Sequence, residues 1–190
     1  MNKRIIINNH KNNSFVNGVN GLILIDLDKE DKKILLCACK KYTKNQTHGI
    51  LLINTEIEEN RELTTKYYET DLFEVNCFCQ INIKEGNKKI KTNYFLVGGF
   101  DVKKRKGIIK LCKIVYINNE FNIEILEDIC INRTREFEGF QGTINSIIQS
   151  KYNGKILISC WDGNVYSFSE PNINYYLEED KEEEEYEFDY

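Results

Sequence analysis

Two closely spaced cysteine pairs, Cys37-Ala38-Cys39 and Cys77-Phe78-Cys79, are the residues of this chain best suited to metal chemistry. Residues two apart on a β-strand point to the same face, so each pair would present two thiols together. Four thiolates can form a structural zinc site. The alternative is that the cysteines are small apolar side chains within tightly packed strands. We favour this alternative, because zinc-binding cysteines are usually separated by two to four residues and lie in a turn.

The two histidines, His10 and His48, are flanked by polar residues and lie apart in sequence from any partner cysteine or carboxylate. We therefore expect both to be solvated loop residues. The sequence contains no nucleophile elbow, P-loop or dinucleotide-binding glycine pattern. Gly98-Gly99 precedes no helix whose N-terminus would hold a phosphate, so we interpret it as a tight strand bend. These observations predict that the chain is not an enzyme and binds no cofactor.

Two features are candidates for a binding function: a compact basic run, Lys103–Lys106, and the single tryptophan, Trp161. The basic run, with Lys110, would suit the phosphates of a nucleic acid, a localisation signal, or a soluble hairpin loop, which is the interpretation we favour. Trp161 either packs against a neighbouring sheet, which we favour, or is exposed as an anchor for a partner. The candidate partner-binding residues are Lys103, Lys104, Arg105, Lys106, Trp161 and Asp162.

Composition predicts one soluble domain inside the cell. The 190 residues are 41% hydrophobic and 29% charged, which is ordinary for a globular protein. No apolar run approaches the roughly 20 residues that cross a bilayer, and Ile5-Ile6-Ile7 is too short for a signal peptide. The seven cysteines are an odd number within strand-like segments, so we expect reduced thiols and a cytoplasmic or nuclear protein.

Charge divides the chain into three parts. Residues 1–19 are rich in Asn and Lys and are predicted to be partly disordered, and residues 20–177 form the folded body. The segment Glu178–Tyr190 has nine acidic residues and one lysine, a net charge of −8. The full chain carries −4, so the other 177 residues carry +4. We expect this tail to be disordered and to solubilise the protein; binding a basic partner or the chain's own basic run are the alternatives.

The body reads as a succession of short strands. Continuous apolar runs such as Ile34–Lys40 suit strands that are buried on both faces. Charged segments, among them Ile83–Thr92, are predicted loops. The predicted strands before residue 140 are Leu22–Leu27, Ile34–Lys40, Gly49–Asn54, Thr64–Thr70, Glu74–Asn82, Asn93–Phe100, Gly107–Tyr116 and Phe121–Ile129.

The stretch Gly142–Phe168 predicts three further strands joined by two tight turns. The first turn is Lys151–Gly154, and the second is Asp162-Gly163, which favours a two-residue type I′ hairpin with positive φ at both positions. The three strands are Thr143–Gln149, Lys155–Cys160 and Asn164–Phe168.

This stretch resembles one blade of a WD40-type β-propeller. The Gly-His and Trp-Asp dipeptides of that family are absent, and Phe140-Gln141-Gly142 and Phe168-Ser169 stand in their places. The residues that carry the resemblance are Gly142, Ile144, Ser146 and Ile147, then Gly154, Ile156, Ile158, Ser159 and Cys160, then Asp162, Gly163, Val165 and Phe168.

A repeat extends the resemblance over the body. The predicted second strands begin at Ile34, Tyr94 and Lys155, about 60 residues apart, which is longer than the usual 40–45 of WD40 repeats. A glycine then starts each third strand: Gly49, Gly107 and Gly163. The second unit is also similar to blades in the large propeller subunits of mRNA-cleavage and damaged-DNA-binding complexes, which are scaffolds.

The resemblance implies an all-β protein of three four-stranded antiparallel blades, the first of them least complete. Propellers generally need four blades or more to close, so we expect an incomplete propeller, or one completed by a partner or an oligomer. The implied function is a non-catalytic protein-interaction scaffold. A nucleic-acid-associated propeller using Lys103–Lys106 and a zinc protein using the cysteine pairs are the alternatives.

Overall fold

The computed structural model describes residues 15–27, 32–42, 47–55, 64–70, 72–85, 88–118, 120–128 and 140–169. These residues form eleven β-strands and no helix, which confirms the predicted all-β class. The acidic tail, His10, Cys130 and the first 14 residues lie outside the described part of the chain.

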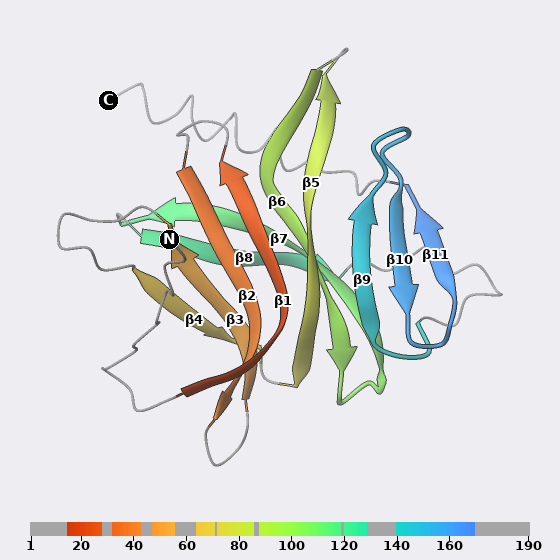
Figure 1. Cartoon of the computed structure of the whole chain (residues 1–190), viewed down its shortest axis with the longest axis horizontal. Helices are drawn as coiled ribbons and strands as arrows, with labels where there is room; N and C mark the ends of the chain where they lie inside the picture. Colours follow the sequence, from red (N-terminus) through yellow and green to blue (C-terminus); the bar gives the residue numbers. More distant parts are fainter. Residues whose placement is uncertain are drawn as a thin grey trace, which may run out of the picture.

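The strands form three antiparallel sheets, each following the order of the chain (Figure 1). The first sheet contains β1 (Phe15–Leu27), β2 (Lys32–Tyr42), β3 (Thr47–Asn54) and β4 (Thr65–Glu69). The second contains β5 (Phe73–Glu85), β6 (Lys88–Asp101), β7 (Lys106–Ile117) and β8 (Glu120–Asp128). The third contains β9 (Ile144–Gln149), β10 (Ile156–Cys160) and β11 (Val165–Phe168).

The predicted grouping into three consecutive units is confirmed, with two corrections. The third sheet has three strands in the described part of the chain, whereas the first sheet has four and is not the least complete. Most of the predicted loop Ile83–Thr92 belongs to the β5–β6 hairpin, in which Ile83 pairs with Ile90. The strand continues there because the Ile83 side chain packs against the core beside the third sheet.

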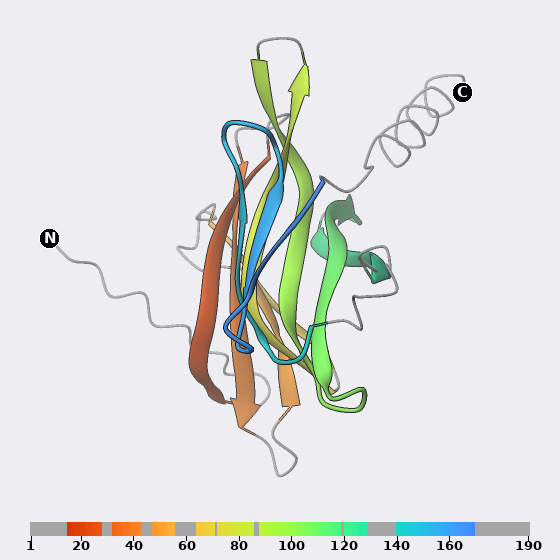
Figure 2. The ribbon, with the colours of Figure 1, turned by 90° about the vertical axis from the view of Figure 1, so that its right-hand side faces the viewer.

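The sheets stack face to face, and their first strands lie side by side: β1 contacts β5, and β5 contacts β9 (Figure 2). The core between the first and second sheets includes Leu36 and Ala38 of β2 with Phe95 and Val97 of β6. The core between the second and third sheets includes Leu96 of β6. Strand β6 is therefore buried on both faces, as its continuous apolar sequence predicts.

Two glutamines fasten the first strands to one another. The Gln80 side chain on β5 accepts a hydrogen bond from the Asp26 backbone N–H (3.4 Å) and donates one to the Asp26 carbonyl (2.9 Å). Gln149 on β9 bonds the backbone N–H and carbonyl of Asn82 on β5 in the same way, both at 2.9 Å. The second and third sheets are thus each joined to the preceding sheet by a side-chain amide that satisfies backbone groups on the neighbouring first strand.

At the other end of these strands, polar side chains form a short ladder across the three sheets. The Asn20 side-chain amide donates to Asn76 Oδ1 (3.2 Å), and the Asn76 side-chain amide donates to the Thr143 hydroxyl (2.6 Å). On each of the three first strands, the residue in this ladder precedes the residue in the glutamine contacts. The first strands are therefore parallel to one another.

Candidate interaction surface

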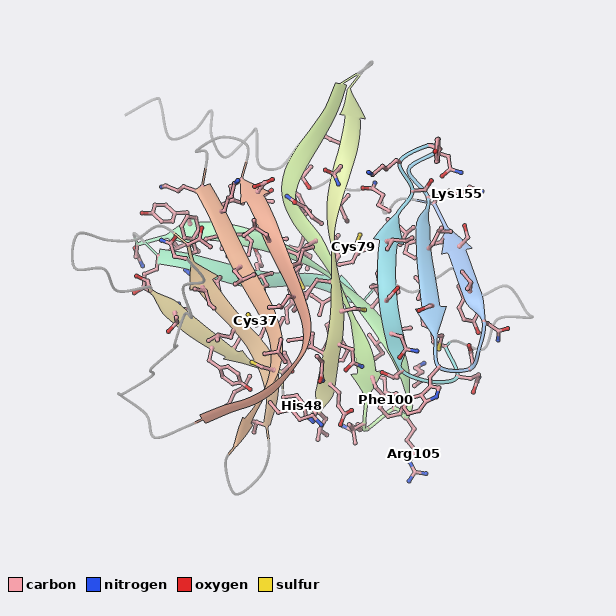
Figure 3. The ribbon with its side chains drawn as sticks, viewed as in Figure 1. Cys37, His48, Cys79, Phe100, Arg105 and Lys155 are labelled. Atoms are coloured by element: carbon pink, nitrogen blue, oxygen red, sulfur yellow. The ribbon has the colours of Figure 1, made fainter. Side chains whose placement is uncertain are left out.

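The topology gathers equivalent turns of the three sheets at one end of the stack. Because the first strands are parallel and each sheet is an antiparallel meander, every turn between a second and a third strand lies where the first strands begin. The basic run is the β6–β7 turn, and Trp161 and Asp162 are in the β10–β11 turn. Figure 3 shows Arg105 at this end, close to the level of His48, and Lys155 at the opposite end.

The β6–β7 turn presents three cations to solvent. Lys103, Lys104 and Arg105 are exposed, whereas Lys106 is half-buried and begins β7, where it pairs with Asp101. The Asp101 carboxylate accepts the backbone N–H of Lys104 (2.8 Å) and lies 3.9 Å from its Nζ atom. Arg105 adopts a φ of 54°, which reverses the chain into β7. The turn is thus closed by an aspartate, and Lys103, Lys104 and Arg105 remain exposed.

The β10–β11 turn differs from the predicted two-residue type I′ hairpin. Its loop contains Trp161, Asp162 and Gly163, because Cys160 donates its N–H to the Asn164 carbonyl (3.2 Å). Gly163 has a φ of 85°, and Asp162 is not among the described residues with positive φ. The Asp162 carboxylate accepts the Asn164 N–H (2.9 Å), which favours this three-residue loop with glycine in the left-handed position.

Asp162 stabilises the β10–β11 turn through its side-chain hydrogen bonds. The Tyr166 hydroxyl donates a hydrogen bond to Asp162 Oδ2, and the Tyr166 ring meets the Phe140 ring edge to face at 5.1 Å. The hydrogen bond from Tyr166 and that from the Asn164 N–H lower the pKa of Asp162, so the carboxylate remains ionised. Trp161 is 77% exposed, so our expectation that it packs against a neighbouring sheet was wrong.

A single segment separates the two turns. Gly107, which follows the basic run, donates its N–H to the Phe140 carbonyl (3.2 Å). A Cβ on Gly107 would lie 2.4 Å from the Gly142 carbonyl oxygen, and one on Gly142 would lie 3.3 Å from the Trp161 Cβ. The basic run and Trp161, far apart in sequence, therefore meet across Phe140–Thr143.

Two exposed apolar side chains extend this surface. Val102 is 42% exposed and donates its N–H to the carbonyl of Leu72 (2.9 Å), which is 53% exposed. The exposed cations and apolar side chains at this end are named here the turn surface: Leu72, Val102, Lys103, Lys104, Arg105 and Trp161.

His48 also lies at this end, in a setting that the sequence did not suggest. It belongs to β3 and not to a loop, because the strand begins at Thr47, which pairs with Lys41. Its Nε2 atom is 3.1 Å from Glu74 Oε1 on β5, and its side chain is only 12% exposed. Burial lowers the pKa of His48, with Glu74 opposing the shift and Lys40 adding to it. The β-prone segment directly after His48 was the one available signal of its strand position.

Stability is expected to decline as the pH falls below neutrality, in part through His48. Its pKa is lowered in the folded chain, so below about 6.5 the unfolded chain binds a proton that the folded chain does not. Urea denaturation at about pH 7.5 and about pH 5.5 should show a smaller decline for His48→Gln than for the unaltered protein. An equal decline in both proteins would show that His48 does not contribute.

The two cysteine pairs do not converge. Cys37 and Cys39 lie on the outer face of the first sheet, whereas Cys77 and Cys79 face the third sheet. Burial raises the pKa of Cys39 to about 11 and that of Cys77 to about 12, so these thiols stay protonated. The six cysteines of the described segments form no disulfide, and no cluster of potential metal ligands occurs among the residues described. This geometry gives the zinc alternative no four-thiol site.

Lys110 is likewise separated from the basic run. It lies on β7, and its Nζ atom is 5.5 Å from the centre of the Phe73 ring. A nucleic-acid contact at this end would therefore depend on the three exposed turn cations.

Comparison with protein families, with curated proteins and with solved structures returns no match to this chain. Nowhere in the described segments is there a helix long and apolar enough to span a membrane.

Proposed function

We propose that this chain is a non-catalytic protein-interaction scaffold, built from consecutive WD40-like propeller blades, whose turn surface binds other proteins. The observation that carries the proposal is the convergence of the basic run and Trp161 at one end of the stack. Meandering sheets that stack through their first strands also suit blades of a propeller. An intracellular location, cytoplasmic or nuclear, belongs to the proposal and is supported by the burial of the cysteine thiols within the strands, as at Cys37, Cys39 and Cys77.

The side chains of the turn surface suit a particular kind of partner. Tryptophan and arginine are enriched among the residues that dominate binding energy at protein interfaces. Here the exposed Trp161 lies at the same end of the stack as three exposed cations, with Val102 and Leu72 adding apolar area. The complementary partner is an acidic segment that carries apolar side chains, because opposite charge steers the encounter and apolar contact stabilises the complex.

Removing the exposed groups of the turn surface is expected to abolish partner capture. The variant combines Lys103→Gln, Lys104→Gln, Arg105→Asn and Trp161→Ala, with asparagine chosen because it tolerates the positive φ of Arg105. Proteins captured from cell extract by the unaltered chain and by the variant would be compared by quantitative mass spectrometry.

The β9–β10 turn at the opposite end provides a matched control. It carries two exposed lysines and a 93% exposed tyrosine, so Lys151→Gln, Tyr152→Ala and Lys155→Gln make a similar change elsewhere. The control should capture the same proteins as the unaltered chain. Equal capture by all three chains would refute the turn surface as the binding site.

A nucleic-acid partner at the same surface is the second candidate. An exposed aromatic beside cations is the arrangement that binds single-stranded nucleic acids by stacking and phosphate contact. Such binding would weaken steeply with salt and would be lost in the turn-surface variant. RNA or DNA binding of this kind, with no turn-surface-dependent protein capture, would favour this candidate.

A further inference from the structure

The two ends of the sheet stack both expose apolar side chains. On the outer face of the first sheet the exposure is confined to β1, where Val19, Leu22 and Leu24 are 53%, 62% and 47% exposed, whereas Cys37 and Cys39 of β2 on the same face are buried. On the outer face of the third sheet, Ile148 of β9 and Val165 of β11 are 56% and 71% exposed. Pairing fixes these faces, since Leu22 lies opposite Cys37, and Ile148 lies opposite Leu157.

The exposed positions match the way the sheets already pack. Both internal joints bring first strands together, β1 with β5 and β5 with β9. The first strand of another sheet would therefore pack on the face of β1 or of β9 that is turned away from β5. Exposed apolar residues are ordinary when scattered, but Leu22, Leu24 and Ile148 all lie on the first strand of an end sheet.

A joint on the outer face of β1 would differ from the internal joints. On β5, the next sheet bonds the backbone of Asn82, and the glutamine that bonds the preceding sheet, Gln80, lies two positions before it. On β1 the residue bonded by the next sheet is Asp26, and the position two before it is Leu24. An apolar side chain thus replaces the amide clamp on β1. Apolar packing would hold this joint, and two chains could form it after each has folded.

We propose that a second copy of this chain covers the exposed apolar side chains at both ends, with the third sheet of each copy packed on the first strand, β1, of the other. The proposal rests on the propeller-like arrangement proposed above. Two copies supply six sheets, within the four to eight blades that close a propeller. A two-fold axis along the centre of the ring makes the two joints identical. The same contact, third sheet on β1, then covers both ends of each copy. Any other single partner would have to present two unlike faces.

The assembly would allow one partner to bind two turn surfaces at once. A two-fold axis parallel to the first strands places both turn surfaces on the same rim of the ring. A partner with two acidic segments would then bind at two points, and the second contact would form at high effective concentration.

The mass of the full chain in solution, measured by light scattering under reducing conditions across a dilution series, tests the proposal. The expected mass is about twice 22.4 kDa. Leu22→Lys and Ile148→Glu should each halve it. An equimolar mixture of these two variants should restore it, because one joint then pairs lysine with glutamate and the other keeps both native residues. Ile117→Lys alters a 53% exposed side chain on β7 of the second sheet and should leave the mass unchanged.

Several outcomes would overturn the proposal. They are a single-chain mass for the unaltered protein, a growing series of larger species, a complex with a different protein, or a mixture of variants that stays monomeric. Restoration by mixing cannot arise from misfolded variants. A monomer that still captures proteins through the turn surface would refute only this assembly, whereas a dimer without such capture would refute only the proposed binding function.

Discussion

Gly99→Ala is expected to lower the free energy of unfolding by about 3 kcal/mol, the upper part of the range for overpacked cores. A Cβ at this position would lie 1.9 Å from the Glu74 carbonyl oxygen and 2.9 Å from its carbonyl carbon. Both atoms belong to the backbone of β5, which is fixed by its pairing with β6 and by its contacts with β1 and β9. The clash is relieved only by separating β5 from β6 at the centre of the molecule.

The adjacent glycine provides the control for this prediction. A Cβ on Gly98 would meet side-chain atoms: Ile147 Cδ1 at 2.7 Å, Cys77 Sγ at 2.8 Å and Ile144 Cγ2 at 2.8 Å. These side chains can shift, so Gly98→Ala should cost about 1 kcal/mol. Urea denaturation of both variants gives the comparison, provided that the slope with denaturant is unchanged. Equal destabilisation of the two variants would show that the β5 backbone shifts as easily as the side chains around Gly98.

The strands were predictable because their signal is local. The run Ile34–Lys40 is apolar at nearly every position, and residues 36–39 are buried from both sides of the first sheet. A pattern of this kind depends only on which residues face a neighbouring layer. The incorrect loop prediction for Ile83–Thr92 shows the limit of this signal, because the charged residues of the segment masked the half-buried position of Ile83. The turn type failed at Asp162 because a side-chain hydrogen bond to Asn164 set the backbone.

The candidate surface was only partly predictable. Its cations and Trp161 were recognisable by type, but their proximity depends on Gly107 and Gly142, which let two segments approach. The pairing of His48 with Glu74 joins two sheets and leaves no pattern within either strand. The glutamine clamps were missed for the same reason, since Gln80 and Gln149 look like ordinary surface residues in sequence. Contacts between sheets therefore had to come from the structure.

Gln149→Leu is expected to loosen the third sheet and to lower the free energy of unfolding by about 2 to 3 kcal/mol. Leucine keeps the approximate volume of glutamine but offers no partner to the Asn82 N–H and carbonyl, both bonded at 2.9 Å. These backbone groups are then left partly buried without a hydrogen bond, which costs more than the bonds themselves contribute. Because Gln149 belongs to the third sheet, the loss should fall on its attachment to β5.

Hydrogen exchange separates this local effect from a general one. Amide protons in β10 should exchange faster in Gln149→Leu, while those in β2 keep their protection, because β2 belongs to the first sheet and has no part in the joint between the second and third sheets. Gln141→Leu makes the same change at an exposed position and should leave both strands unaffected. Uniformly faster exchange in β2 and β10 would mean that the three sheets unfold together and that the clamp supports the whole stack. Faster exchange confined to the third sheet would identify Gln149 as the attachment that sets its docking on β5.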